Sequence, residues 1–227
     1  MTHSQSAGQQ DKAKIFDAVL LSLIWIVVCW MVFLSEDMWG WQMKKLGVHP
    51  REISGLPGVL SMAFLHNTWE HLTQNTLAIF VLNSILFYFY RKIAPQIWLI
   101  SMVSSHALLW LIGREGNHIG ASALLYAEFG FLIFSGFIRG DSRLMRAALV
   151  VLLYYGSLVW YVFPIEQHVS WEGHASGLMT GAILSWIFRK KGPQRRIYQY
   201  ELDPELPDDE NAYWKIREEH ETKGFNS

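Results

Sequence analysis

Residues 15–34 read IFDAVLLSLIWIVVCWMVFL, an apolar run that only Asp17 and Ser22 interrupt. A helix rises about 1.5 Å per residue, so about 20 such residues cross the roughly 30 Å of hydrocarbon in a bilayer. The residues that follow offer no small-residue cleavage site. We therefore expect a retained transmembrane helix and not a removable signal peptide.

Five further apolar segments follow the first one. They are Leu72–Tyr90, Gln96–Gly113, Ala121–Ile138, Ala147–Phe163 and Trp171–Phe188. Several are short and contain polar residues, which membrane helices tolerate where other helices surround them. The sequence predicts an all-α membrane protein in which residues 15–189 form a bundle of six transmembrane helices. Residues 1–14 and the polar tail 190–227 flank this bundle.

The composition excludes several classes of protein. The 227 residues carry a net charge of −1, and 51% are hydrophobic while only 17% are charged. Soluble domains contain about 25% charged residues. These numbers exclude a disordered chain and a nucleic-acid binder with a basic face. The single cysteine, Cys29, excludes a disulfide within the chain and a cysteine-based metal site.

Lys and Arg are unevenly divided between the two sides of such a bundle. Twelve lie near one set of span ends: Lys12, Lys14, Arg91, Lys92, Arg139, Arg143, Arg146, Arg189, Lys190, Lys191, Arg195 and Arg196. The opposite connections contain four: Lys44, Lys45, Arg51 and Arg114. Because cytoplasmic connections are enriched in Lys and Arg, we expect both termini in the cytoplasm.

Two segments outside the spans have features of their own. The connection from Ser35 to His66 mixes aromatic and basic residues, which suits the lipid headgroup zone, although an ordinary external loop remains an alternative. The tail from Tyr200 onward holds nine acidic and three basic residues. Within this tail, Asp208 and Asp209 predict the cap of a short helix that ends near residue 220.

Polar residues gather at the starts of three predicted spans. His66, His71 and Asn75 lie at the start of the second span, Ser122 at the start of the fourth, and His174 near the start of the sixth. All three spans run from the outside to the inside, so these starts lie at one depth near the outer leaflet. Ionisable groups inside a membrane are costly and are usually functional.

The types of these residues suggest nucleophilic catalysis. A serine becomes a nucleophile when a base takes its proton, and Ser122 and His174 are a candidate pair. His71 and Asn75 lie four residues apart on one helix face and could donate hydrogen bonds to an oxyanion, as could the backbone N–H of Ser122. Tyr126 follows Ser122 by four residues on the same helix face, where it could orient the His174 ring.

Small residues recur at every fourth position in two of these spans. They are Gly173, Gly177 and Gly181 in the sixth span, and Ala123 and Ala127 in the fourth. Such spacing lets two helices pack closely, which a contact between a hydroxyl and an imidazole requires. On its own the stripe indicates packing, and only its coincidence with Ser122 and His174 points to catalysis.

Three motifs in the chain resemble those of the rhomboid family of intramembrane serine proteases. They are His66-Asn-Thr-Trp-Glu-His71-Leu-Thr-Gln-Asn75, Gly120-Ala-Ser122-Ala123 and Gly173-His174-Ala-Ser-Gly177-Leu-Met-Thr-Gly181. The resemblance covers roughly residues 58–186, and Val169-Ser-Trp-Glu-Gly-His174 resembles a bacterial branch of the family. Each motif alone is weak, but their order and spacing together are specific.

The resemblance implies a six-helix bundle whose active site lies below the outer surface of a bacterial inner membrane. Ser122 would be the nucleophile and His174 the general base of a dyad without an aspartate. His71 and Asn75 would help to form the oxyanion hole, and His66 would have a more structural role. Substrates would be other transmembrane proteins of the lipid bilayer. No metal or organic cofactor is implied, and the oligomeric state stays open.

Three features depart from the family pattern. Ala123 stands where the family usually has glycine, and its methyl group is expected to crowd the oxyanion region or to narrow the substrate pocket. Trp41 is followed by Gln42 and not by the arginine common in the family. Glu128 lies about 240° around the helix from the serine, which is too far to complete a triad, and His106 is its candidate partner.

Two other functions remain open at this point. The chain could be a non-catalytic rhomboid-like protein that binds membrane clients; Ala123 supports this interpretation, and the presence of both Ser122 and His174 opposes it. It could also be a haem or metal carrier that uses histidines. The candidate ligands are His66, His71, His106 and His118, but the chain has no HExxH motif.

Overall fold

The computed structural model describes residues 2–165 and 169–195. Contacts divide the chain into residues 1–194 and 195–227, and every helix of the described residues belongs to the first unit. The short helix that the sequence predicts near residues 208–220 lies outside the described residues.

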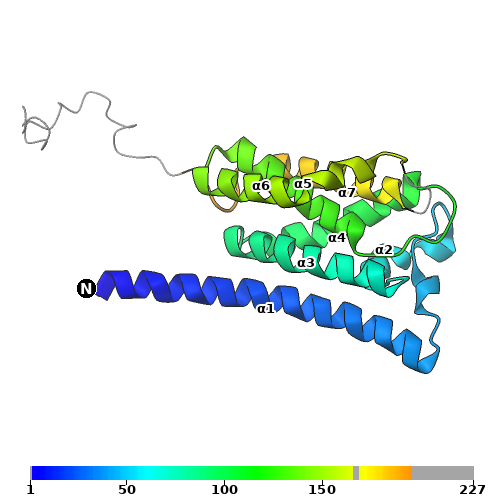
Figure 1. Cartoon of the computed structure of the whole chain (residues 1–227). Coiled ribbons are helices and arrows are strands. Elements are labelled where there is room, and N and C mark those ends of the chain that lie inside the picture. Colours follow the sequence, from blue (N-terminus) through cyan, green and yellow to red (C-terminus); the bar gives the residue numbers. More distant parts are fainter. Residues whose placement is uncertain (1, 166–168, 196–227) are drawn as a thin grey trace, which may run out of the picture. The chain divides into compact units, whose positions relative to one another are not determined.

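The described residues fold into seven α-helices and four short 3₁₀ helices (Figure 1). In chain order these are α1 (Thr2–Trp39), η1 (Met43–Leu46), η2 (Ile53–Gly55), α2 (Gly58–Ser61), η3 (Met62–Phe64), α3 (Trp69–Phe89), α4 (Ala94–Ile112), α5 (Ser122–Arg139), α6 (Ser142–Tyr155), η4 (Gly156–Val162) and α7 (Trp171–Ile187).

Four of these helices are long and apolar enough to cross a membrane: Gly8–Trp39 of α1, and the whole of α3, α4 and α5. They coincide with the first four predicted spans, so the chain is a multi-pass membrane protein. The fifth predicted span falls on α6 and η4, of 14 and 7 residues, and the sixth falls on α7, of 17 residues. The predicted count of six spans is therefore not confirmed, because each of these last helices is shorter than the about 20 residues usual for a crossing.

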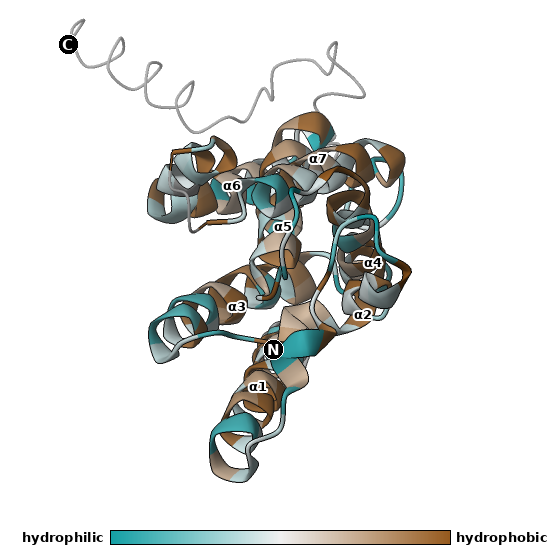
Figure 2. Cartoon of the chain, turned by 90° about the vertical axis from the view of Figure 1, so that its right-hand side faces the viewer, coloured by the Kyte–Doolittle hydropathy of each residue, from teal (hydrophilic) through white to brown (hydrophobic). Residues whose placement is uncertain are grey.

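The first helix, α1, lies beside α3 (Figure 1). Many of its apolar side chains are exposed, among them Ile24, Val27 and Met31. It is hydrophobic between two hydrophilic ends (Figure 2). Its polar residues have partners: Asp17 pairs with Arg91, and Ser22 Oγ lies 2.9 Å from the Ala18 carbonyl and 3.0 Å from Ser84 Oγ. Asp17 and Ser22 are thus paired within the protein, whereas the buried Trp25 Nε1 has no hydrogen-bond partner among the described residues.

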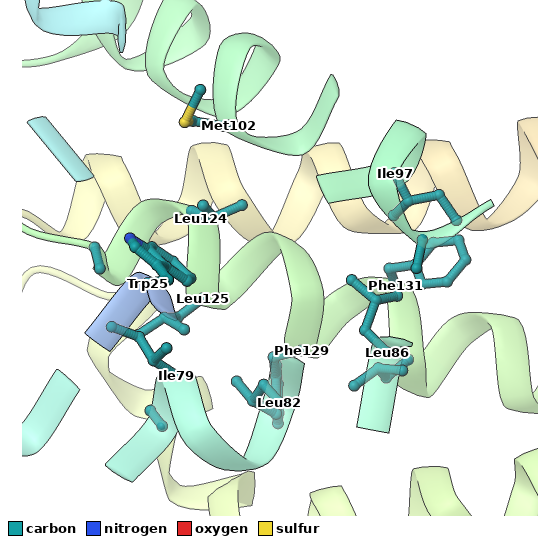
Figure 3. Packing of buried hydrophobic residues seen from close by; sticks show 14 of the residues in the cluster. Trp25, Ile79, Leu82, Leu86, Ile97, Met102, Leu124, Leu125, Phe129 and Phe131 are labelled. Atoms are coloured by element: carbon teal, nitrogen blue, oxygen red, sulfur yellow. The ribbon is translucent and has the colours of Figure 1, made fainter. Parts of the chain in front are cut away.

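The central helix is α5, in which every residue from Ala123 to Leu132 is buried. It packs against α3, α4, α6 and α7. Figure 3 shows apolar side chains from several of these helices in one cluster, among them Ile79, Leu82 and Leu86 of α3, Met102 of α4, and Leu124, Leu125, Phe129 and Phe131 of α5. This core fixes α5 and therefore the position of its first residue, Ser122.

The closest helix contact joins α5 to α7. A Cβ added at Gly177 would overlap the Ala123 carbonyl oxygen, and one added at Gly181 would overlap the Ala127 carbonyl oxygen. The two backbones therefore touch, as small residues at four-residue spacing allow. This contact brings the first turn of α5 beside the first turn of α7.

Candidate active site

Ser122 opens α5 at the end of a tightly held loop, residues 113–121. Val48 and His118 exchange two backbone hydrogen bonds of 2.9 Å, and the Gly120 N–H donates to the Met62 carbonyl at 2.9 Å. The loop is therefore fixed to the segment that precedes α3. Because backbone bonds hold both sides of the loop, Ser122 has a defined position and is half-buried.

Gly120 allows this loop to approach the first turns of α3. Its φ angle is +118°, and a Cβ there would lie 2.6 Å from His71 Cε1 and 3.7 Å from Asn75 Nδ2. Only glycine adopts this conformation readily and leaves that space empty. The backbone just before Ser122 therefore lies against both side chains that the sequence singles out as oxyanion donors.

The first turns of α3 present His71 and Asn75 to the loop. Thr68 caps this helix, because its Oγ1 accepts a hydrogen bond from the His71 N–H at 3.1 Å. Asn75 is buried, and its Nδ2 has no hydrogen-bond partner among the residues the structure describes. Buried polar groups usually have partners, so this amide is a donor available to a ligand.

His66 is buried against the ring of His71. The two ring centroids are 5.1 Å apart, and the His66 side chain is 1% exposed. Burial, followed by the nearby His71, lowers the pKa of His66 to about 3. The ring is therefore neutral at physiological pH. Its burial against His71 suits the structural role that the family resemblance implies.

His174 is held by two contacts in the first turn of α7. Its ring stacks on Tyr126 with centroids 4.1 Å apart and planes within 8°, so the contact expected from the spacing is present. Its Nδ1 lies 2.9 Å from the Tyr161 carbonyl oxygen. A carbonyl only accepts hydrogen bonds, so Nδ1 carries the proton and the lone pair of the neutral ring lies on Nε2.

Most of these groups line one cavity of about 1130 Å³, although His66 and Gly120 do not. Its lining includes Ser122, His174, His71, Asn75 and Tyr126. Among the described residues no hydrogen bond joins Ser122 to His174. The bond between a nucleophile and its base is often long in a free enzyme and tightens with substrate. The cavity exceeds the 300–1,000 Å³ usual for small ligands and is large enough for a peptide segment.

Two expectations from the sequence are wrong. The Ala123 methyl does not line the cavity: the residue is 0% exposed and packs with Val48, Met62 and Leu109. It therefore does not narrow this cavity, and the alternative, that it crowds the oxyanion region, stays a prediction. Glu128 does not pair with His106, because neither of its carboxylate oxygens has a partner in the described part of the chain. His106 Nδ1 instead lies 2.8 Å from the Val59 carbonyl.

Two residues of this region were not assigned to it from the sequence. His118, considered only as a metal ligand, lines the cavity, and its Nδ1 lies 2.7 Å from Ser170 Oγ. Ser170 caps α7 through the Gly173 N–H at 3.3 Å. A serine just before an apolar helix is a recognisable cap signal, but nothing local predicts its contact with residue 118. Residues 2–165 and 169–195 contain no cluster of three metal-ligating side chains.

The sequence matches the family model of the rhomboid domain over residues 55–191. An uncharacterised protein of Mycobacterium tuberculosis is 29% identical over 185 residues, which cover 77% of this chain and 75% of its own length. An uncharacterised protein of Mycobacterium leprae is 26% identical over 186 residues, which cover 77% of this chain and 72% of its own length. The matched region of the family model contains every residue of the candidate site.

Proposed function

Because the chain belongs to the rhomboid family, we propose that it is an intramembrane serine endopeptidase that cleaves other transmembrane proteins. One observation carries the proposal: Ser122, His174, His71 and Asn75 come from three helices and line the same cavity. The lone pair on His174 Nε2 adds a base of the right kind, since the Tyr161 carbonyl occupies the other ring nitrogen.

In the acylation step, Ser122 Oγ attacks the carbonyl carbon of the scissile peptide bond. The serine proton passes to His174 Nε2, and a tetrahedral intermediate with one negatively charged oxygen forms. This intermediate collapses, the C–N bond breaks, and the proton on Nε2 passes to the leaving amine. An ester between Ser122 and the substrate remains.

The oxyanion needs donors that point to it before the reaction begins. The Asn75 amide, the His71 ring and the Ser122 backbone N–H are the proposed donors. Gly120 supports this assignment, because it precedes the serine by two residues and a Cβ there would lie against both α3 side chains. The donors are held by α3 and α5, so little reorganisation is needed as charge develops.

In the deacylation step, water replaces the amine. His174 Nε2 takes a proton from the water molecule, whose oxygen attacks the ester carbonyl. The second tetrahedral intermediate collapses, and the proton returns from Nε2 to Ser122 Oγ. The second product leaves with a new carboxyl group, and the enzyme is restored.

The membrane setting is part of the same proposal. The protein lies in a bacterial inner membrane with both termini in the cytoplasm, and α6 with η4 and then α7 supply the fifth and sixth crossings. Residues 15–189 form the membrane domain, between a cytoplasmic segment 1–14 and a cytoplasmic tail 190–227. The uneven distribution of Lys and Arg supports this orientation.

A serine-directed fluorophosphonate probe tests the proposal without a known substrate. We expect the purified full-length protein to be labelled, and Ser122→Ala to abolish labelling while the thermal midpoint stays unchanged. Ser142→Ala is the matched control, because Ser142 is also the first residue of a helix but does not line the cavity. Equal labelling of wild type and Ser122→Ala would contradict the proposal. A wild type that is not labelled would favour a non-catalytic rhomboid-like protein that binds membrane clients.

A further inference from the structure

A chain of hydrogen bonds joins the loop before Ser122 to the start of α7. His118 Nε2 lies 2.9 Å from the Arg114 carbonyl oxygen, and His118 Nδ1 lies 2.7 Å from Ser170 Oγ. Ser170 Oγ in turn accepts a hydrogen bond from the Gly173 N–H at 3.3 Å. His118 is 7% exposed, so water competes weakly for these bonds.

In the neutral form of the His118 ring, the chemistry of these groups fixes the direction of each bond. The Arg114 carbonyl can only accept, so His118 carries its proton on Nε2. His118 Nδ1 is then an acceptor, and the Ser170 hydroxyl donates to it. The Ser170 oxygen keeps a lone pair for the Gly173 N–H. Neutral His118 therefore satisfies both partners, with the opposite tautomer to that of His174.

The contact between His118 and Ser170 joins two segments that each lead into a candidate catalytic residue. His118 lies four residues before Ser122, and Ser170 lies four residues before His174. The His174 N–H donates to the Ser170 carbonyl at 3.2 Å, so the backbone of Ser170 is also tied to the first turn of α7. The bond between His118 and Ser170 thus links the segment that holds the nucleophile to the helix that holds the base.

A second contact joins the same two segments. Arg114 donates a hydrogen bond to the Val169 carbonyl at 2.7 Å, and its Nε lies 3.6 Å from an oxygen of Glu172. This ion pair is half open to solvent, because the Arg114 side chain is 43% exposed. The His118–Ser170 bond is the more buried of these two contacts, so water and salt screen it less.

We propose that His118 is a positioning residue that acts through Ser170 to set the separation between Ser122 Oγ and His174 Nε2. This role rests on the proposed protease function. His118 takes no proton from the substrate and contacts neither reacting atom. It aligns two groups that belong to different helices, and a misplacement of about 1 Å between such groups can cost on the order of 10² in rate.

The first test measures how fast a fluorophosphonate labels the full-length protein at increasing probe concentration. We expect His118→Gln and Ser170→Ala each to lower the maximal rate constant of labelling at least about 10-fold, with little change in half-saturating probe concentration. Ser170→Thr keeps a hydroxyl group and should recover most of the rate lost in Ser170→Ala. His49→Gln is the matched control, since His49 adjoins Val48 but does not line the cavity.

The second test asks whether the effect passes through the dyad. In a His174→Ala background, adding His118→Gln should not slow the residual labelling further, because there is no base left to align. The double variant His118→Gln with Ser170→Ala should be no slower than the slower single variant, since both changes break the same bond. A general loss of structure would instead slow labelling in every background and would lower the thermal midpoint.

A third measurement detects the bond itself, even if a variant folds poorly. Nitrogen NMR of the wild-type protein with labelled histidine should show the proton of His118 on Nε2. Ser170→Ala should shift the Nδ1 signal, because the hydroxyl donor is gone, and Ser170→Thr should leave it near its wild-type position.

The outcomes separate this role from the protease function. Labelling of the wild type that depends on Ser122, together with normal maximal rates in His118→Gln and Ser170→Ala, would overturn the positioning role alone. An equal loss of rate with and without His174 would overturn it as well. A wild type that is not labelled at Ser122 would overturn the protease function, and the positioning role with it.

Discussion

The imidazole of His174 has no carboxylate partner among the described residues and is oriented by a backbone carbonyl and a stacked ring. The Tyr161 carbonyl fixes the tautomer, and Tyr126 fixes the plane of the ring. In a triad an aspartate would do both and would also stabilise the imidazolium. A neutral carbonyl fixes the tautomer but stabilises the imidazolium less than a carboxylate does. The rate of the reaction should therefore depend more strongly on the alignment of Ser122 and His174.

Substitution of Asn75 tests its proposed role as an oxyanion donor. Asn75→Ala should lower the maximal rate of fluorophosphonate labelling by up to about 10²–10³, the usual cost of losing one such donor, and by less where His71 compensates. Asn83→Ala is the control, because Asn83 is also buried on α3 with an unpartnered Nδ2 in the described structure but does not line the cavity. Equal effects of the two substitutions on the labelling rate would contradict the assignment of Asn75 to the oxyanion hole.

Substitution of Gly120 tests whether activity requires the loop 113–121 to lie against His71. Gly120→Ala should abolish most labelling, since the new Cβ would lie 2.7 Å from His71 Nε2. Gly116→Ala is a close control: it lies in the same loop with a φ of +140°, and its added Cβ would meet nothing within 4 Å. Both variants bear a similar backbone strain, so a difference in labelling measures the contact with His71. Comparable labelling of the two variants would show that this contact is not needed.

At the scale of elements, the contact between α5 and α7 controls how the serine and the histidine meet. Gly177→Ala should lower the free energy of unfolding by about 1–3 kcal/mol, the usual cost of overpacking, because its Cβ would overlap a backbone oxygen of α5. Gly173→Ala should lower the free energy of unfolding by less, since the nearest atom to its added Cβ would be the Ser170 Oγ at 3.1 Å. The thermal midpoints of the two variants check which substitution is more destabilising. A larger decrease in thermal midpoint for Gly173→Ala than for Gly177→Ala would contradict the described packing.

The start of α6 should make stability depend on pH. Asp141 caps this helix by accepting from the Arg143 and Leu144 N–H groups, and the hydrogen-bonded Arg143 side chain lowers the pKa of Asp141 below 3.8. A lowered pKa in the folded state means that the stabilisation is present above the unfolded pKa and is lost as pH falls through the folded pKa.

Asp141→Ala should therefore lower the free energy of unfolding by about 1 kcal/mol at pH 7. Asp141→Asn should retain most of the cap but lose the charge. The advantage of the wild type over Asp141→Asn should disappear as the pH is lowered past 3.8. Thermal unfolding in detergent at several pH values checks this, and an advantage that grows on acidification would contradict it.

At the scale of the whole molecule, the number of crossings can be tested with single cysteines. The native Cys29 is fully buried and should not react with an impermeant maleimide. Ile53→Cys and Ile165→Cys, at side chains that are 84% and 65% exposed, should react from outside intact cells. Lys191→Cys should react only after lysis. Protection of Ile165→Cys in intact cells would contradict the two short crossings.

The sequence alone was sufficient for features that depend on local composition. The length and hydropathy of a segment decide whether it forms a membrane helix, and the first four predicted spans agree with α1, α3, α4 and α5 within a few residues at most ends. The start of α1 is the exception, because its helix continues into polar residues. The sequence also predicted the polar residues at the starts of α3, α5 and α7, because residues four positions apart lie on one helix face.

Other features required the tertiary structure, because they depend on how each helix is rotated about its axis and on the path of the connecting loops. Ala123 follows Ser122 in the chain, yet its side chain packs into the core while the serine faces the cavity. Neither the missing pair between Glu128 and His106 nor the bond from His118 to Ser170 follows from spacing. The sequence by itself determined that the chain is a membrane protein with one polar layer. Only the packing of α5 on α7, and of the loop on α3, decided which of those polar groups share a cavity.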